Sequence, residues 1–238
     1  MTRRRFIADE FSGDRAALIG EHADHLVRVL RARVGQEFDI AVGSSVHRGK
    51  IVSVDSERVE FELGEAVTSQ ESTQITLALS IFKFDRMEWA IEKCTELGVS
   101  RIIPVVARRT DAHLASASAK RVERWQRIVR QASEQSRRAV PPEIAAPVRL
   151  SEIFSLQSGL RIVLSESEDR TPLRDAVKAN AEEGVFLAIG PEGGWTDDEL
   201  QSFQHAGWIS ASLGNTILRA ETAAIAATAI VSSVLASL

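Results

Sequence analysis

The chain has 238 residues, of which 44% are hydrophobic and 26% are charged. This is the balance of an ordinary globular protein and excludes a disordered or fibrous one, and the length leaves room for a small domain beside a larger one. The formal net charge of −4 argues against a nucleic-acid binder whose whole surface is basic, so any contact with nucleic acid must use local basic patches.

The N-terminal part of the chain predicts a small β-rich unit with one helix. The helix is expected over residues 25–33, with Leu26 and Val29 among the apolar residues on its inward face. Residues 38–67 then alternate between apolar and polar positions in a way that indicates short strands, with a turn at 55–58.

Neither end of the chain indicates a membrane segment. The first residues read MTRRRFIADEF, where no apolar run follows the arginines, so we expect no signal peptide, no anchor and a cytoplasmic location. Residues 222–238 carry no charge, but their serines and threonines suit a lipid phase poorly. A buried helix is expected there, one able to pack against its copy in a second subunit.

Beyond a polar stretch at residues 65–74, the best candidate linker, apolar runs of strand length alternate with helical segments. This alternation predicts an α/β domain with a mainly parallel sheet. The expected strands cover residues 75–82, 101–106, 161–165, 185–190 and 208–213, and the helices between them begin near Asp85, Ala119, Pro172 and Thr196. We therefore expect two domains, at residues 1–70 and 75–238.

A glycine-rich loop follows the expected strand at 185–190 and reads GPEGGW. In an open α/β sheet, ligands bind beyond the carboxyl ends of the strands, and glycines let a ligand approach the backbone closely. Thr196 and Glu199 stand at capping-box spacing and predict where the next helix begins. The alternative is a tight strand-to-helix turn that binds nothing.

A second loop, at residues 213–222, reads LGNTILRAET and joins the last expected strand to the uncharged helix. Arg219 and Glu221 directly precede that apolar segment. Burying a charge there is costly unless the charge is paired or takes part in function. They are two residues apart and would not face each other on a helix. They are candidate functional groups, and an ion pair formed through the loop is the alternative.

Familiar nucleotide and metal motifs are absent from the sequence. It contains no G-x-x-x-x-G-K-[ST], and no G-x-G-x-x-G follows an early strand, which argues against a Rossmann-type methyltransferase. Its single cysteine, Cys94, lies in an apolar helical context, which indicates a small buried core residue rather than a reactive thiol. His22 and His25 share a helical face, but without nearby cysteines or a matching acidic cluster they do not indicate a zinc site. No metal site is expected.

Several segments resemble one known family. GPEGGWTDDEL and LGNTILRAETA resemble the paired C-terminal signatures of SPOUT-superfamily methyltransferases, in particular the RsmE family of ribosomal RNA uridine-N3 methyltransferases. DRMEWAIEKCTELGVSRIIPV and ERWQRIVRQASEQSRR resemble the start of that family's catalytic domain and its next helix, and HADHLVRVLRARVGQEF resembles its N-terminal module. Together these segments cover most of the chain in the family's order.

The resemblance implies a fold and a cofactor that spacing alone does not indicate. The fold would be a PUA-like β-barrel, which binds RNA, at 1–70, followed at 75–238 by a SPOUT domain with a C-terminal trefoil knot. The enzyme would be a homodimer that uses S-adenosylmethionine. Carried onto this sequence, the cofactor-binding residues would be Leu164, Ile189, Gly190, Pro191, Glu192, Gly193, Leu213, Gly214, Ile217, Leu218 and Ala223.

The reaction that the resemblance implies is methylation of N3 of a uridine in 16S ribosomal RNA. Three residues are candidates for catalysis. Arg219 would stabilise the uracil oxygens or hold a phosphate, and Glu221 or Glu192 would accept the N3 proton; which of the two acts stays open. The candidate RNA-binding residues are Arg28, Arg31, Lys120, Arg124, Arg127 and Arg138, the last four on one stripe of a predicted helix. A non-catalytic ribosome assembly factor and methylation of another RNA position are the alternatives.

Overall fold

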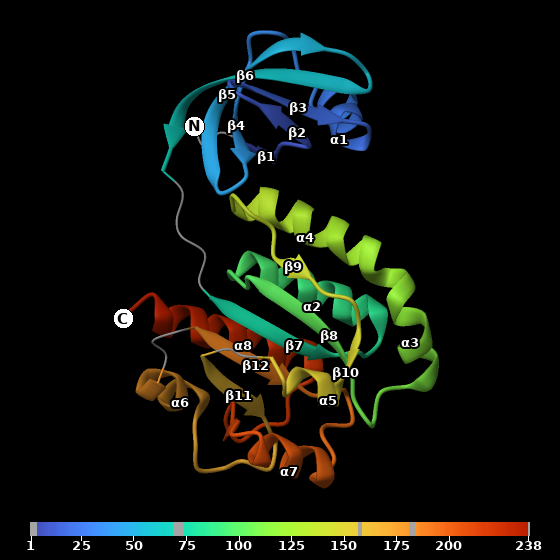
Figure 1. Ribbon diagram of the computed structural model, residues 1–238, viewed down its shortest axis with the longest axis vertical. Coiled ribbons are helices and arrows are strands. Elements are labelled where there is room, and N and C mark those ends of the chain that lie inside the picture. Colours follow the sequence, from blue (N-terminus) through green and yellow to red (C-terminus); the bar gives the residue numbers. More distant parts are fainter. Residues whose placement is uncertain (1–3, 69–73, 157–158, 181–183, 238) are drawn as a thin grey trace. The chain divides into compact units, whose positions relative to one another are not determined.

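The computed structural model describes residues 4–68, 74–156, 159–180 and 184–237 (Figure 1). The described residues form two compact units, and each is described by itself. The first consists of Met1–Glu71 with Ser133–Pro141, and the second of Ser72–Ala132 with Pro142–Leu238. No local pattern in the sequence indicates that a segment from the middle of the chain belongs to the first unit.

The first unit is built on a curled, mostly antiparallel sheet in the order β1-β4-β5-β6-β3-β2 (Figure 1). Its strands are β1 Arg5–Ile7, β2 Glu10–Ser12, β3 Arg15–Ile19, β4 Glu37–Val42, β5 Ser45–Val54 and β6 Arg58–Val67. The strands predicted over 38–67 are confirmed as β4, β5 and β6, and the N–H of Asp55 donates to the carbonyl of Arg58 in the predicted turn. β1 and β2 contain three residues each, too few to show a period in the sequence, and β3 was not predicted either.

The core of this unit lies inside the curl of the sheet. Ile40, Ile51 and Phe61, from three successive strands, are fully buried there. Gly49 faces this core, and a Cβ at that position would lie 2.4 Å from the Cγ1 atom of Ile40. The absence of a side chain at Gly49 therefore lets Ile40 fill the space.

The helix predicted over residues 25–33 begins and ends four residues earlier than expected and is wound differently. A single α-helical turn, α1 Glu21–Asp24, passes directly into a π-helical turn, His25–Val29, and Arg31 then adopts a positive φ of 53°. The i to i+5 hydrogen bonds of a π-helix rotate later residues away from the face that a 3.6 period predicts. Val29 is consequently 64% exposed, whereas Leu26 is buried as predicted.

The second unit is built on a parallel sheet, as the sequence predicts. Its strands run in the order β10-β8-β7-β12-β11-β13, and β9 also pairs with β8. The strand bounds are β7 Ile75–Ser80, β8 Arg101–Val106, β9 Glu143–Ile144, β10 Val148–Arg149, β11 Leu160–Leu164, β12 Val185–Ile189 and β13 Ile209–Ala211. The two-residue strands β9 and β10 were not predicted. Part of the expected linker is strand, because β6 continues to Val67; residues 69–73 lie outside the described residues.

Helices cover both faces of this sheet (Figure 1). Alternate residues of one strand point to opposite faces, so Leu77 of β7 joins one hydrophobic cluster with helices α2 and α8, while Ala78 joins another with Phe203 of α7. The helices of this unit, α4 extending beyond it, are α2 Phe84–Glu96, α3 Ala112–Ala117, α4 Val122–Ser136, α5 Leu150–Ile153, α6 Leu173–Asn180, α7 Asp197–His205 and α8 Ala220–Leu235.

Helix α8 is the uncharged segment that the sequence predicts to be a buried helix. One side of it, including Ala224, Ala227 and Thr228, is completely buried. The hydroxyl of Thr228 donates to Sγ of Cys94, which is also fully buried, and burial raises the pKa of this thiol to about 12. Cys94 is therefore core filler. Within the described part of the chain, no helix is long and apolar enough to cross a bilayer.

Candidate active site

Three neighbouring strands bring their carboxyl-terminal loops together at one edge of the parallel sheet. β11 lies between β12 and β13, so the loops that follow these strands converge although they are far apart in sequence. In sheets of this kind, the ends of the strands where the chain changes direction across the sheet form the binding crevice. Both loops selected from the sequence are at this place.

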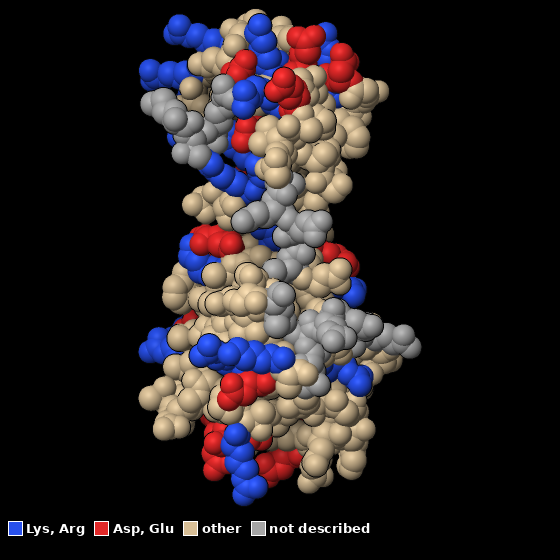
Figure 2. Space-filling model, turned by 90° about the vertical axis from the view of Figure 1, so that its left-hand side faces the viewer, with Lys and Arg blue, Asp and Glu red and all other residues tan. Residues whose placement is uncertain are grey.

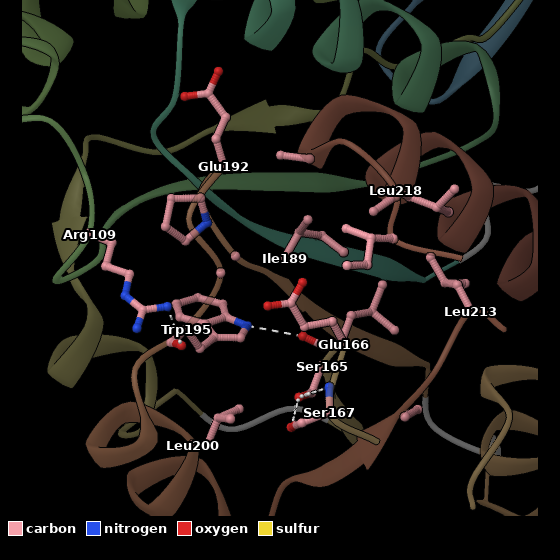
Figure 3. Close-up of a pocket in the computed structure, with 18 of the residues that line it drawn as sticks. Arg109, Ser165, Glu166, Ser167, Ile189, Glu192, Trp195, Leu200, Leu213 and Leu218 are labelled. Atoms are coloured by element: carbon pink, nitrogen blue, oxygen red, sulfur yellow. Dashed lines mark hydrogen bonds between the residues drawn. The ribbon is translucent and has the colours of Figure 1, made fainter. Parts of the chain in front are cut away.

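A pocket of about 360 Å³ lies among these loops (Figure 3). This volume is within the range of small-molecule sites, which is roughly 300–1,000 Å³. Apolar side chains form much of its wall, and Glu166 extends into it beside Gly194. The lining residues are Arg109, Leu164, Ser165, Glu166, Ser167, Ile189, Gly190, Pro191, Glu192, Gly194, Trp195, Asp197, Leu200, Ala211, Leu213, Gly214, Thr216, Ile217, Leu218, Ala220 and Ala223.

The glycine-rich loop is held from two sides. The indole Nε1 of Trp195 donates to the carbonyl of Leu164 at 3.1 Å, which ties the loop to the end of β11 (Figure 3). Nη1 of Arg109 donates to the carbonyls of Gly193 at 2.6 Å and of Trp195 at 3.2 Å. These bonds fix the pocket wall before any ligand arrives, because each joins segments that are distant in sequence.

The capping box predicted from Thr196 and Glu199 is confirmed at the start of α7. The carboxylate of Glu199, which is 8% exposed, accepts from the N–H of Thr196 at 2.8 Å and from the N–H of Arg108 at 2.7 Å. One buried side chain therefore caps the helix and also holds the loop that follows β8.

We expect Glu199→Ala to lower the free energy of unfolding by about 2–4 kcal/mol, because it leaves the backbone N–H groups of Thr196 and Arg108 without an acceptor. Urea unfolding followed by circular dichroism measures this loss. Glu199→Gln keeps one acceptor oxygen and serves as the control, with a smaller loss. A stability for Glu199→Ala equal to that of the parent would contradict the role of this carboxylate.

The residues assigned to the cofactor from the sequence lie around this pocket, with one exception. Leu164, Ile189, Gly190, Pro191, Glu192, Leu213, Gly214, Ile217, Leu218 and Ala223 all line it. Gly193 does not line the pocket, because its carbonyl is turned to Arg109 and a Cβ there would lie 3.3 Å from Cδ of that arginine. Gly193 stays a predicted cofactor-binding residue that is not among those lining this pocket, and a large side chain at this position would press on Arg109.

The two candidate carboxylates are connected by an arginine that was not predicted. Nη1 of Arg86, on α2, lies 3.5 Å from Oε1 of Glu192, and its Nε atom lies 3.8 Å from Oε1 of Glu221. Glu192 lines the pocket and its side chain is 37% exposed, whereas the side chain of Glu221 is 5% exposed. The ion pair between Arg219 and Glu221, which was an alternative from the sequence, is not formed. Arg86 instead provides the positive charge that faces Glu221.

One carboxylate oxygen and one guanidinium near the pocket form no hydrogen bond with the described residues. The Oε2 atom of Glu221 is buried and accepts no hydrogen bond from the described residues. Arg219 is the N-cap residue of α8, between the pocket residues Leu218 and Ala220, and its exposed side chain forms no hydrogen bond or ion pair with the described part of the chain. Its guanidinium is therefore available to a ligand.

Sequence reasoning missed Arg86, Arg109 and the segment Ser165–Ser167. Each follows the carboxyl end of a strand of the parallel sheet, β7, β8 and β11 respectively. The same rule that selected the two C-terminal loops would have selected these positions as well. Their contacts could not be read from the sequence, because they depend on which strands are neighbours.

The candidate RNA-binding residues are mostly exposed, but not all are unpaired. Arg28 forms an ion pair with Asp24 at 2.6 Å, and Nε of Arg124 lies 2.7 Å from Oε1 of Glu88. Figure 2 shows basic and acidic side chains interspersed over the visible face of each unit. Arg31, Lys120 and Arg127 are exposed, and Lys120 belongs to a 3₁₀ turn at Ser118–Arg121.

Arg138 does not lie on the helical stripe to which it was assigned. Helix α4 ends at Ser136, and Arg137 then adopts a positive φ of 62°. Arg138 is half-buried, and burial lowers the pKa of its guanidinium. It belongs to the first unit, whereas Lys120, Arg124 and Arg127 belong to the second. The prediction continued the helical period of 3.6 residues beyond Ser136, where the helix ends, so the basic stripe is shorter than predicted.

The amino-acid sequence is similar to those of a known family of proteins. Residues 69–232 match an RNA methyltransferase domain. Ribosomal RNA small subunit methyltransferase E of Synechocystis is 35% identical over 220 residues, which cover 90% of this chain and 71% of that protein. The protein of the same name from Aquifex aeolicus is 30% identical over 223 residues, covering 92% and 95%.

Solved structures agree with this placement. The enzyme of the same name from Neisseria gonorrhoeae, bound to S-adenosyl methionine, is 30% identical and superposes with a TM-score of 0.84 over 98% of both chains. The mixed α/β fold with its parallel sheet, predicted from the alternation of strands and helices in the sequence, is confirmed by this likeness. The chain therefore belongs to the ribosomal RNA small subunit methyltransferase E family.

Proposed function

We propose that this protein transfers a methyl group from S-adenosylmethionine to N3 of a uridine in 16S ribosomal RNA. The observation that carries the proposal is the pocket at the carboxyl ends of β11, β12 and β13. It occurs in a chain that is 30% identical, over 98% of its length, to a family member solved with S-adenosyl methionine bound.

The pocket suits this cofactor chemically. The side chains of Leu164, Ile189 and Leu218 offer apolar walls for an adenine ring. The carboxylate of Glu166 offers an acceptor to hydroxyl or amino groups, which the ribose and the methionine part of the cofactor both carry. Gly214, at φ 112° with open space beside it, presents its backbone to the pocket with no side chain at that position.

The cofactor supplies an electrophilic methyl group when it is bound. The protein must then help uracil N3 to lose its proton and must stabilise the charge that develops on the neighbouring oxygens. Glu192 is the better candidate for accepting the proton, because it lines the pocket while Glu221 does not. The unpaired guanidinium of Arg219 would donate to the uracil oxygens, and the proton would pass from Glu192 to solvent.

Recognition of the RNA is proposed to involve both units. The curled sheet of the first unit would act as the PUA-like RNA-binding domain, spanning 1–70. Exposed Arg31, Lys120 and Arg127 would contact phosphates, which contribute affinity but no sequence information. An assembled small subunit in the cytoplasm is the proposed substrate.

A trefoil knot and a homodimer are further parts of the proposal. Helix α8 follows the edge strand β13 but packs against β7 and β12 in the middle of the sheet, as well as against α2 and α6. A C-terminal segment threaded through the preceding loops would follow such a path. The partly exposed residues of α8, among them Ile225 and Ile230, offer an apolar face to a second copy.

Calorimetric titration with S-adenosylmethionine and methylation of purified 30S subunits, 50S subunits and transfer RNA test the proposal. Cofactor binding and transfer to 30S subunits alone are expected. Transfer to another RNA would instead support a family member of different specificity. If the folded protein bound 30S subunits but showed no cofactor binding, even with RNA present, the result would favour an assembly factor.

Filling the pocket should remove cofactor binding. Ala223→Trp places an indole in the wall formed by the first turn of α8, and we expect the affinity for S-adenosylmethionine to fall by about tenfold or more, a loss of at least ~1.4 kcal/mol. Calorimetry measures the change. Gln201→Trp, at an exposed position of α7, is the matched control and should bind normally. Equal affinity in both variants would place the cofactor elsewhere.

A further inference from the structure

Arg86 is the cation between the two carboxylates of the candidate active site, Glu192 and Glu221. We propose that Arg86 is a positioning residue for methyl transfer: it holds Glu192 of the glycine-rich loop and Glu221 of α8 in a fixed relation beside the pocket. The proposal rests on the proposed function, because it assigns Arg86 a task in that reaction.

The position of Arg86 in the fold suits this task. It is the third residue of α2, close after the end of the central strand β7. Its Nη1 atom faces Glu192 and its Nε atom faces Glu221, so different corners of one planar guanidinium serve the two carboxylates. The side chain thus connects three elements, α2, the loop after β12 and the start of α8, that are widely separated in sequence.

The charges of the three side chains explain how Arg86 can hold the two carboxylates in place. A carboxylate that is as buried as Glu221 needs a compensating charge or hydrogen bonds, and its Oε2 atom has no hydrogen-bond partner among the described residues. Arg86 provides this compensating charge, because its guanidinium lies beside the Glu221 carboxylate. The two N–O distances, 3.5 and 3.8 Å, are longer than ordinary hydrogen bonds of about 2.9 Å. The bridge is thus mainly Coulombic, and it can tighten when substrate displaces water.

A purely structural ion pair between α2 and α8 is the competing explanation. It predicts that loss of Arg86 lowers stability and that activity falls only as far as the folded fraction or cofactor binding falls. A positioning role predicts a fall in kcat for enzyme that is folded and saturated with cofactor. The two explanations therefore differ in how kcat, cofactor affinity and the melting temperature change together.

The test compares Arg86→Gln, Arg86→Lys and the control Lys93→Gln. Lys93 lies on the same helix, its side chain is also 33% exposed, and the acidic partners recorded for it, Glu92 and Glu96, lie on α2 itself. For each variant, the melting temperature, the calorimetric affinity for S-adenosylmethionine and the kcat for methylation of 30S subunits are measured.

We expect Arg86→Gln to lower kcat by about 10–100-fold, the cost of a misplaced reacting group, with little change in cofactor affinity. Arg86→Lys should recover most of the loss, and Lys93→Gln should match the parent. If Arg86→Gln does not fold, the double variant Arg86→Gln/Glu221→Gln removes the uncompensated buried charge. Its kcat should stay low although its fold is restored.

Two results would overturn the proposal. One is a parental kcat in folded Arg86→Gln; the other is a kcat that returns to the parental value whenever folding is restored, as in the double variant. These results leave the proposed function intact, because the parent still binds cofactor and methylates RNA. A parent that does neither overturns the proposed function, and the role of Arg86 with it.

Discussion

Replacing Glu192 by glutamine is expected to reduce methyl transfer by about 10²–10⁴-fold, the contribution typical of a general base. Glutamine has nearly the same shape, but it does not take a proton from N3 and carries no charge to face Arg86, whose separate contribution Arg86→Gln measures. The carboxylate lines the pocket and its side chain is 37% exposed, so substrate can reach it. Single-turnover methylation of 30S subunits with saturating cofactor measures this step directly.

Two comparisons make the result specific. Asp198→Asn removes an exposed carboxylate from the first turn of the neighbouring α7 and should leave transfer close to the parental rate. Glu221→Gln tests the other carboxylate, and its effect should be smaller because Glu221 does not line the pocket. A larger loss in Glu221→Gln than in Glu192→Gln would reverse the assignment of the base.

Replacing Arg219 by alanine is expected to lower kcat by about 10²–10³-fold, the loss seen when one donor to a developing negative charge is removed. The side chain is exposed and forms no hydrogen bond or ion pair with the described residues, so its removal should leave the melting temperature unchanged. Cofactor affinity should also be retained, because Arg219 does not line the pocket. Quenched-flow methylation and calorimetry separate these quantities.

Arg174→Ala is the matched control for this prediction. Arg174 is an exposed arginine of α6, with no ion pair recorded for it in the described structure, and it is not among the pocket residues. Both variants lose one surface charge, but only Arg219→Ala should lose transfer. Equal activity of the two variants would show that Arg219 does not act on the substrate.

Much of the second unit could be predicted because its strands are continuous apolar runs that are buried on both faces. β8 and β12, for example, begin where the sequence pattern places them. β9 and β10 contain two residues each and carry no period. The π-helical turn at His25–Val29 depends on a local change in hydrogen bonding that hydrophobic spacing does not reveal.

The parts of the site that directly follow predicted strands could be located from the sequence. The glycine-rich loop and the loop before α8 could be selected because both follow predicted strands, and the structure brings them to one pocket. The contacts of Arg109 with Gly193 and of Arg86 with Glu192 join residues 84 and 106 positions apart. Such contacts depend on the order of strands in the sheet, which the sequence pattern does not contain.

The most direct test of the proposed function is to find the methylated base. Purified 30S subunits lacking the modification would be incubated with the protein and isotopically labelled S-adenosylmethionine, and the 16S RNA would then be digested and analysed by mass spectrometry of its nucleosides. We predict labelled 3-methyluridine at a single position, formed about 10²–10³-fold more slowly when Arg219→Ala replaces the parent. Label in another nucleoside, or no label with folded protein and intact subunits, would contradict the account.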